Sequence, residues 1–158
     1  MKNKFFDYMD KVMETNKDVY LLFVGLGWPR ITEFMKKYPD RAINTEASEQ
    51  TALDIAVGLA YAGKTPFVYT ITPFLYRGFE TIRTYINRES LNVKLIGVGR
   101  NDEYSKHDGF SHDATDAWSI LGAMTNVRQL YPDTDTEMTS MIDSALGSSF
   151  PFFISIPR

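Results

Sequence analysis

Two short polar segments hold most of the side chains that are suited to acid–base or nucleophilic chemistry. Residues 45–49 contain Glu46 and Glu49, and residues 100–112 contain His107 and His112. Carboxylates and imidazoles are the usual proton donors and acceptors of enzymes. The chain has no cysteine, which excludes a thiolate nucleophile, a thiolate metal site and a disulfide framework. These residue types therefore favour proton transfer, or hydrogen bonding of a ligand by a carboxylate.

Residues 100–112, here called the histidine segment, also contain residue types that could bind a metal ion. His107 and His112 lie near Asp102, Asp108 and Asp113, and imidazole with carboxylate is a common ligand set for zinc and related ions. Charged residues in loops are more often simply solvated, so the sequence favours no metal site on this chain.

Other familiar motifs are missing or weak. The sequence contains no GxxxxGK[ST] phosphate loop, no GxGxxG after the first apolar run and no HExxH. The pair Gly25-x-Gly27 predicts a tight turn after a strand rather than a dinucleotide site. Ser111, His112 and Asp116 would make a hydrolytic triad on paper, but no nucleophile elbow accompanies them.

Alternating apolar runs and helical patterns must position these residues. The predicted strands are 19–25, 41–44, 66–71, 93–99, 127–130 and 152–156, and the predicted helices are 28–38, 48–62, 74–86, 114–124 and 135–146. Arg100–Ser111 is rich in charge and is expected to be a surface loop. Strands that alternate with helices predict an α/β fold of three αβα layers, with a six-stranded, mostly parallel sheet.

Ligands of such sheets bind at the carboxyl ends of the strands. The segments that follow the predicted strands are 26–29, 45–49, 72–77 and 100–112. They include both polar segments named above, which places Glu49 and His112 at the same edge of the sheet.

Length and charge narrow the class of protein further. A chain of 158 residues has the size of one domain, and its 44% hydrophobic content supports a real core. Seventeen basic against twenty acidic residues give a net charge of −3 without a dense basic stripe, so nucleic acid is not an expected partner. Residues 1–10 mix charges with aromatics and resemble neither a signal peptide nor a membrane span. We expect no membrane partner and a cytoplasmic location.

Four segments, in order, resemble one enzyme family. NTEASEQTALDIAVGLA (44–60) resembles the signature of the pyrimidine-binding domain of transketolase-like thiamine diphosphate enzymes. PFVYTITPFLYR (66–77) is similar to the strand and aromatic turn of the 1-deoxyxylulose-5-phosphate synthase branch. DGFSH (108–112) resembles the family's Asp-Gly-Pro-Thr-His loop, and PFFISIPR (151–158) resembles its last strand. The resemblance covers about residues 18–158.

The resemblance implies a role for five residues. Glu49 matches the catalytic glutamate, whose carboxyl group hydrogen-bonds a ring nitrogen of the cofactor's aminopyrimidine and so promotes deprotonation of the thiazolium carbon. Phe74 matches the ring that stacks on the pyrimidine, and Arg77 matches an arginine that binds within the site. Asp108 and His112 match residues that contact substrate oxygens, and His112 would also polarise a carbonyl or move a proton. Without the resemblance, Glu49 would be an ordinary acidic residue in a first helical turn.

The resemblance also implies what else the protein needs. Residues 1–158 would form a single pyrimidine-binding domain, with 1–17 as an N-terminal helical extension. The diphosphate and its Mg²⁺ would be held by a separate subunit, and no metal by this chain, in a heterotetramer built about a two-fold axis. Phe110 and Ser111 replace the family's proline and threonine, which leaves the choice of substrate open.

Three functions remain open at this point. The first is ketol transfer, of two carbons between sugars or sugar phosphates, by a split transketolase-like enzyme. The second is a decarboxylating acyloin synthase, and the third is a noncatalytic regulatory module with the same fold. An independent small-molecule binder is a further possibility.

Overall fold

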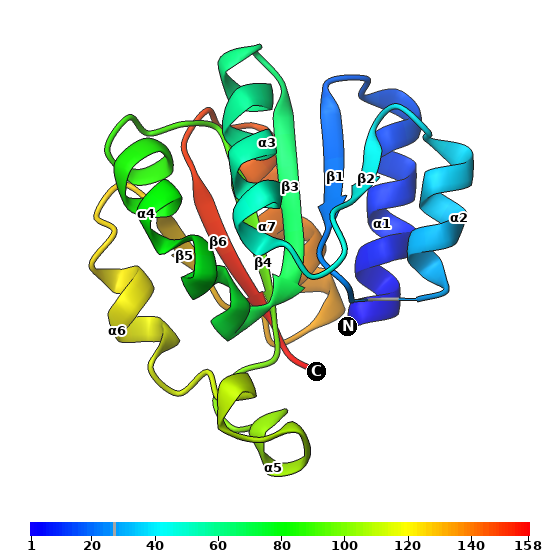
Figure 1. Ribbon diagram of the computed structural model, residues 1–158. Helices are drawn as coiled ribbons and strands as arrows, with labels where there is room; N and C mark the ends of the chain where they lie inside the picture. The colour runs from blue at the N-terminus through cyan, green and yellow to red at the C-terminus, as the bar shows by residue number, and fades with distance from the viewer. Residues whose placement is uncertain (27) are drawn as a thin grey trace.

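A six-stranded β-sheet, in which every neighbouring pair is parallel, forms the centre of the computed structural model, which describes residues 1–26 and 28–158 (Figure 1). The strands are β1 (Val19–Phe23), β2 (Ala42–Asn44), β3 (Thr65–Ile71), β4 (Lys94–Val98), β5 (Arg128–Leu130) and β6 (Phe152–Ile156), in the order β2-β1-β3-β4-β6-β5. Because all strands are parallel, their carboxyl ends share one edge of the sheet.

Helices cover both faces of this sheet. One face carries α1 (Lys2–Thr15), α2 (Arg30–Lys37) and α7 (Asp135–Leu146); the other carries α3 (Glu49–Tyr61), α4 (Phe79–Thr81) and α6 (Ala117–Gly122). Along β1, Leu21 and Phe23 join one core cluster while Leu22 joins the other. The strands are apolar on both faces for this reason. The predicted three-layer α/β fold is confirmed.

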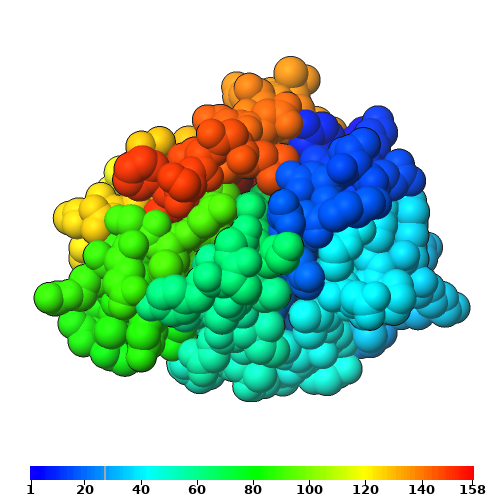
Figure 2. Space-filling view, turned by 90° about the horizontal axis from the view of Figure 1, so that it is seen from above, coloured from blue at the N-terminus to red at the C-terminus, as the bar shows by residue number. Residues whose placement is uncertain are grey.

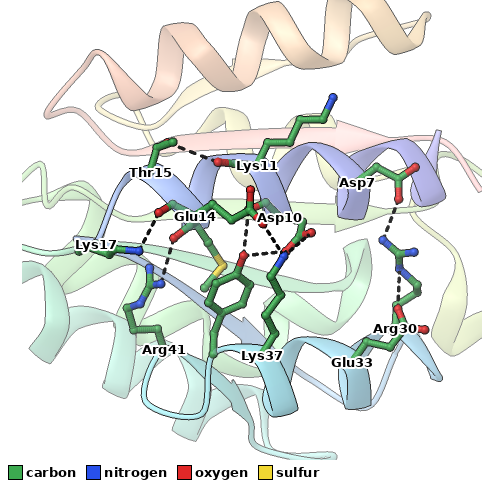
Figure 3. Close-up of polar contacts among 12 residues, drawn as sticks. Asp7, Asp10, Lys11, Glu14, Thr15, Lys17, Arg30, Glu33, Lys37 and Arg41 are labelled. Atoms are coloured by element: carbon green, nitrogen blue, oxygen red, sulfur yellow. Dashed lines mark hydrogen bonds and ion pairs between the residues drawn. The ribbon is translucent and has the colours of Figure 1, made fainter.

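Helix α1 is part of the hydrophobic core. Its residues Phe5, Phe6, Met9 and Met13 are fully or almost fully buried against the sheet. Figure 2 shows α1, in blue, beside α7, in orange. On its outer side, Asp7 and Asp10 of α1 pair with Arg30 and Lys37 of α2, each at 2.8 Å (Figure 3). The first helix therefore completes one layer of the fold.

The helix predicted at residues 74–86 is wrong in type. The segment forms a 3₁₀ helix, η1 (Thr72–Gly78), then α4, then a π-helix, η2 (Ile82–Asn87). Pro73 opens η1, and Gly78 lies so close to Leu53 that a Cβ atom at this position would be 2.2 Å from Leu53 Cδ1. The close approach of Gly78 to α3 constrains the backbone of this segment. The helix type therefore changes from 3₁₀ to α to π along residues 72–87.

Three other predictions differ in their limits. The helix predicted at 28–38 is α2, and the one predicted at 114–124 is the shorter α6, because Ala114 instead forms a β-bridge with Asn101. The predicted loop 100–111 contains one turn of helix, α5 (Ser105–Asp108), followed by η3 (Phe110–His112), and projects from the body of the molecule (Figure 1).

Gly25 has the positive φ of a tight turn (58°), while Gly27 lies outside the described residues. No helix in the described ranges has the length and apolar character to cross a membrane.

Lys94 is a buried cation at the amino end of β4. Its ammonium group donates hydrogen bonds to the carbonyl oxygens of Ser148 (3.0 Å) and Phe150 (2.6 Å) and lies 4.9 Å from the centre of the Phe152 ring. Burial, and secondarily the positive charge of Arg128, lower the pKa of Lys94 to about 7. In the unfolded chain this pKa returns to the ordinary value near 10.5.

We predict that Lys94 makes the fold more stable as the pH rises above 7. Between pH 7 and about 9.5 the unfolded chain binds a proton at Lys94 that the folded chain has released, so the unfolding free energy rises with pH. Urea denaturation should give a slope for the wild type that exceeds that of Lys94→Met by about 1 kcal/mol per pH unit.

Lys64→Met is the matched control. Lys64 is more exposed and pairs with Asp18 at 2.7 Å, which raises its pKa and keeps it charged throughout this range. Its substitution should leave the slope unchanged. Equal slopes for the wild type and Lys94→Met would show that Lys94 stays protonated when buried.

Candidate active site

Glu49 is a buried carboxylate at the start of a helix. It is the first residue of α3, and its side chain is 5% exposed. Its Oε1 atom accepts a hydrogen bond from Arg77 Nη1 at 2.7 Å, and Arg77 is the only hydrogen-bond donor to this side chain among the described residues. The helix dipole and the guanidinium both favour negative charge at this position. Glu49 Oε2 is left to accept or share a proton with another group.

The 3₁₀ winding of η1 places two predicted site residues on one side. Residues i and i+3 of a 3₁₀ helix eclipse one another, so Arg77 lies directly over Phe74. The guanidinium carbon is 4.0 Å from the centre of the Phe74 ring, within the range of a cation–π contact. Arg77 therefore connects the buried carboxylate to the aromatic ring. A regular α-helix, as expected from the sequence, would have offset the two side chains.

His112 joins this group from the other polar segment. Its ring lies edge-on to Phe74, with 4.9 Å between ring centres, and its Nδ1 atom is 3.1 Å from Ser111 Oγ. The structure thus brings together four of the predicted residues, Glu49, Arg77, Phe74 and His112, at the carboxyl edge of the sheet. They come from three different segments.

Asp108 and Glu46 lie apart from this group. Asp108 is exposed at the end of α5, and its side chain forms no hydrogen bond with another described residue. Glu46 is exposed and accepts a hydrogen bond from Asn44 at 2.9 Å, within its own turn. Of the two carboxylates in the 45–49 segment, only Glu49 is built into the interior.

A tyrosine that the sequence did not indicate holds the two halves of the site together. Tyr76, in η1, donates a hydrogen bond to Asp116 at 3.0 Å, just beyond the histidine segment. Burial, and then the hydrogen bond and charge of Asp116, raise the pKa of Tyr76, so the hydroxyl keeps its proton. The β-bridge of Asn101 with Ala114 closes the base of the same segment. No spacing in the sequence pairs these residues, because they are 40 and 13 positions apart.

The other chemistries considered from the sequence find no support in this geometry. Within residues 1–26 and 28–158, no three histidine or acidic side chains are grouped as metal ligands. Asp102 pairs with Lys106, and Asp113 accepts hydrogen bonds from Thr115 and Ser105. Ser111 contacts His112, but Asp116 binds Tyr76 and does not complete a triad.

The fold and this group of residues define a class of ligand-binding α/β domain. A carboxylate with one uncommitted oxygen, a half-buried aromatic ring and an imidazole meet at the carboxyl edge of a parallel sheet. Such a set fits a flat, nitrogen-containing ring, which offers a hydrogen-bonding edge to the carboxylate and a face to the aromatic ring.

The chain belongs to the family described as transketolase, pyrimidine binding domain, whose sequence model matches residues 3–158. It is 28% identical over 128 residues to one of the subunits of the apulose-4-phosphate transketolase of Actinobacillus succinogenes, a match that covers 80% of this chain and 41% of the relative. It is 30% identical over 130 residues to the 1-deoxy-D-xylulose-5-phosphate synthase of Listeria monocytogenes, covering 82% of this chain and 21% of the relative. The chain thus spans less than half the length of these relatives.

Solved structures show the same fold. A structure described as a split gene transketolase, in the form of an inactive β4 tetramer, superposes with a TM-score of 0.86 at 24% identity, covering 99% of this chain and 50% of that chain. The transketolase of Campylobacter jejuni superposes with a TM-score of 0.85 at 17% identity, covering 99% and 25%. At these identities the superpositions establish the fold alone.

We predict that Glu49 and Arg77 stabilise each other more than a surface pair does. Removing one partner leaves the other without its hydrogen bond, and Glu49 is buried, although Arg77 is 49% exposed. A double-mutant cycle with Glu49→Gln and Arg77→Met, followed by urea denaturation, should give a coupling energy of about 1–2 kcal/mol.

The control is the exposed pair Glu80–Arg83. Its members are 2.8 Å apart at i, i+3, with side chains 69% and 57% exposed. The corresponding cycle should give a clearly smaller coupling energy, because solvent screens both charges. Equal coupling in the two cycles would mean that burial of Glu49 adds nothing to the ion pair.

Proposed function

We propose that this chain is one subunit of a split, thiamine diphosphate-dependent, transketolase-like enzyme that transfers a two-carbon ketol unit between sugars or sugar phosphates. The observation that carries the proposal is the buried Glu49 carboxylate, linked to Phe74 through Arg77, in a chain of the pyrimidine-binding family. The name of one relative, which is itself a single subunit of a transketolase, supports a split enzyme.

The site residues fit the aminopyrimidine of thiamine diphosphate. Glu49 Oε2 accepts no hydrogen bond from a described residue, so it is available to a ring nitrogen. Phe74 is only half-buried and offers a ring for stacking, although Arg77 lies over it in this structure. When bound, thiamine diphosphate would supply a thiazolium carbon that serves as the carbon nucleophile of the reaction.

Each site residue then has a role. Glu49 exchanges a proton with the pyrimidine nitrogen, and Phe74 fixes the plane of the ring. Arg77 moves off the Phe74 face and keeps its hydrogen bond to Glu49 Oε1. It can do so because its long side chain is half-exposed. His112 and Asp108 bind the carbonyl and hydroxyl oxygens of the substrate, and His112 moves a proton to or from them.

A second subunit supplies the rest of the site in this proposal. It binds the diphosphate and Mg²⁺, and this chain self-associates about a two-fold axis to form a heterotetramer. The fold match to a split gene transketolase, described as a β4 tetramer and inactive, is consistent with a chain that assembles alone but needs a partner for activity.

Decarboxylating synthesis is the second candidate. The relatives at 30% identity are 1-deoxy-D-xylulose-5-phosphate synthases, and the sequence from β3 through Arg77 resembles that branch. A synthase would release carbon dioxide from a 2-oxo acid in each turnover, whereas ketol transfer releases none. Measuring carbon dioxide separates the two reactions.

The test is reconstitution with a candidate diphosphate-binding subunit, thiamine diphosphate and Mg²⁺. Mixing should produce ketol transfer that neither subunit shows alone. Glu49→Gln should lower kcat by about 10²–10⁴-fold, because an amide cannot exchange a proton with the pyrimidine nitrogen as a carboxyl group does. Sedimentation velocity should show that this variant still binds the partner subunit.

Glu46→Gln is the matched control, since Glu46 is an exposed carboxylate three residues away. It should keep nearly full activity. Full turnover by Glu49→Gln would contradict the role of Glu49. A mixture that binds no thiamine diphosphate with any candidate partner would favour the noncatalytic regulatory module.

A further inference from the structure

Helix α1 begins beside the candidate active site. Its first residue, Lys2, donates a hydrogen bond from Nζ to the hydroxyl of Tyr104 at 3.2 Å, although the two are 102 positions apart. Tyr104 belongs to the histidine segment, is 6% exposed, and has its ring centre 6.4 Å from that of His112. Both ends of the chain, marked N and C in Figure 1, lie at this edge of the sheet. The first helix therefore supplies a side chain to the surroundings of a proposed substrate-binding residue.

Arg158 contacts the same tyrosine. Its guanidinium carbon is 4.6 Å from the centre of the Tyr104 ring, within the range of a cation–π contact. Its main-chain N–H donates to Glu103 Oε2 at 2.9 Å, and its Nη1 atom donates to the Glu103 carbonyl oxygen at 3.1 Å. These bonds hold Arg158 against the histidine segment. Because a guanidinium has several N–H donors and Arg158 is exposed, most of these donors are available to a ligand.

The positive charges of Lys2 and Arg158 are not neutralised by a carboxylate. Within residues 1–26 and 28–158, their side chains donate to a hydroxyl and to a carbonyl oxygen, and neither forms an ion pair. Glu103 uses Oε2 to accept from the main-chain N–H groups of Arg100 and Arg158, each at 2.9 Å. Arg100, in contrast, is paired with Asp133 at 2.7 Å. Lys2 and Arg158 are therefore two cations that are available to a ligand at this edge.

The positions of these two cations suit a single anion with several oxygen atoms. Lys2 Nζ is 5.7 Å from the ring centre of Tyr104 but 3.2 Å from its hydroxyl, so it lies at the hydroxyl end of the ring. The Arg158 guanidinium is nearer to the ring centre. A phosphate group can accept hydrogen bonds from an ammonium and a guanidinium at the same time. His112 neighbours both Tyr104 and Phe74, and therefore connects the cations to the proposed cofactor site.

We propose that Lys2 is a specificity-determining residue, which binds the terminal phosphate of a sugar substrate together with Arg158. This phosphate lies at the end of the sugar that does not react, so its binding selects the substrate without taking part in the transfer. The sequence model of the family begins at residue 3, so Lys2 lies outside the matched segment. The inference rests on the proposed function and, within it, favours sugar phosphates over free sugars.

The first experiment compares a ketose phosphorylated at its terminal carbon with the same ketose unphosphorylated, using the reconstituted enzyme. Lys2→Met keeps the apolar stem and removes the charge. It should raise KM for the phosphorylated ketose by about 10-fold, since one charge-assisted hydrogen bond is lost. The kcat should stay the same, because the contact is equally strong in the ground state and the transition state. Both constants for the unphosphorylated ketose should stay unchanged, and Lys2→Arg should restore the lower KM.

Lys4→Met is the matched control. Lys4 is exposed and follows Lys2 by two residues in α1, which turns its side chain about 200° away around the helix axis. Its substitution should change neither KM. A Lys2→Met variant with an unchanged KM for the phosphorylated ketose, or with equal changes for both ketoses, would overturn the inference and leave the proposed function in place.

A binding measurement on the chain alone separates the inference from the proposed function. Reductive methylation adds isotopically labelled methyl groups to the lysines and keeps their positive charge, and Lys2→Met and Lys4→Met assign two of the NMR signals. Millimolar phosphorylated ketose should shift the Lys2 signal, the unphosphorylated ketose should not, and the Lys4 signal should respond to neither. If Lys2 responds in this way but no partner subunit gives turnover, the proposed function fails and the phosphate site stands. No response at Lys2, or equal responses at Lys2 and Lys4, would refute the site.

Discussion

The burial of one carboxylate at the start of α3 is the constraint on which the site depends. A carboxylate out of water must be paired or hydrogen-bonded, and Glu49 obtains its partner, Arg77, from the segment after β3. That pairing brings η1 against the beginning of α3. The approach is made possible by Gly78, where any side chain would collide with Leu53. The contact between η1 and α3 thus satisfies both the pairing of the Glu49 carboxylate and the close packing of Gly78 on Leu53.

The same contact explains how distant segments come to share one edge of the sheet. Once η1 lies on α3, its 3₁₀ winding presents Phe74 toward His112, and Tyr76 reaches Asp116. The histidine segment is then held at its base by the Asn101–Ala114 bridge and, two residues further along the chain, by the hydrogen bond of Tyr76 to Asp116. The positions of the catalytic candidates are thus set by backbone geometry and by hydrogen bonds to two carboxylates, Glu49 and Asp116.

The sequence was sufficient for the architecture but not for these contacts. Apolar runs buried on both faces, separated by helical patterns, define a parallel sheet, and the bounds of α7 and β6 were predicted to the residue. The winding of residues 72–87 was not predictable, because it depends on the approach of Gly78 to Leu53, and these lie 25 positions apart.

Arg77 and Arg100, both at the carboxyl edge of the sheet, differ in burial and in the number of groups that hold them. Arg100 is 17% exposed and donates to two carbonyls and a carboxylate, so moving it would free three acceptors at once. Arg77 is half-exposed, and its contacts are one carboxylate and one ring face, which are the same two groups that a flat heterocycle would engage. A ligand ring can therefore occupy the Phe74 face and Glu49 Oε2 while Arg77 keeps its hydrogen bond to Oε1. The half-exposed cation lies where a cofactor is proposed to bind, and the anchored one holds β6 to the segment after β5.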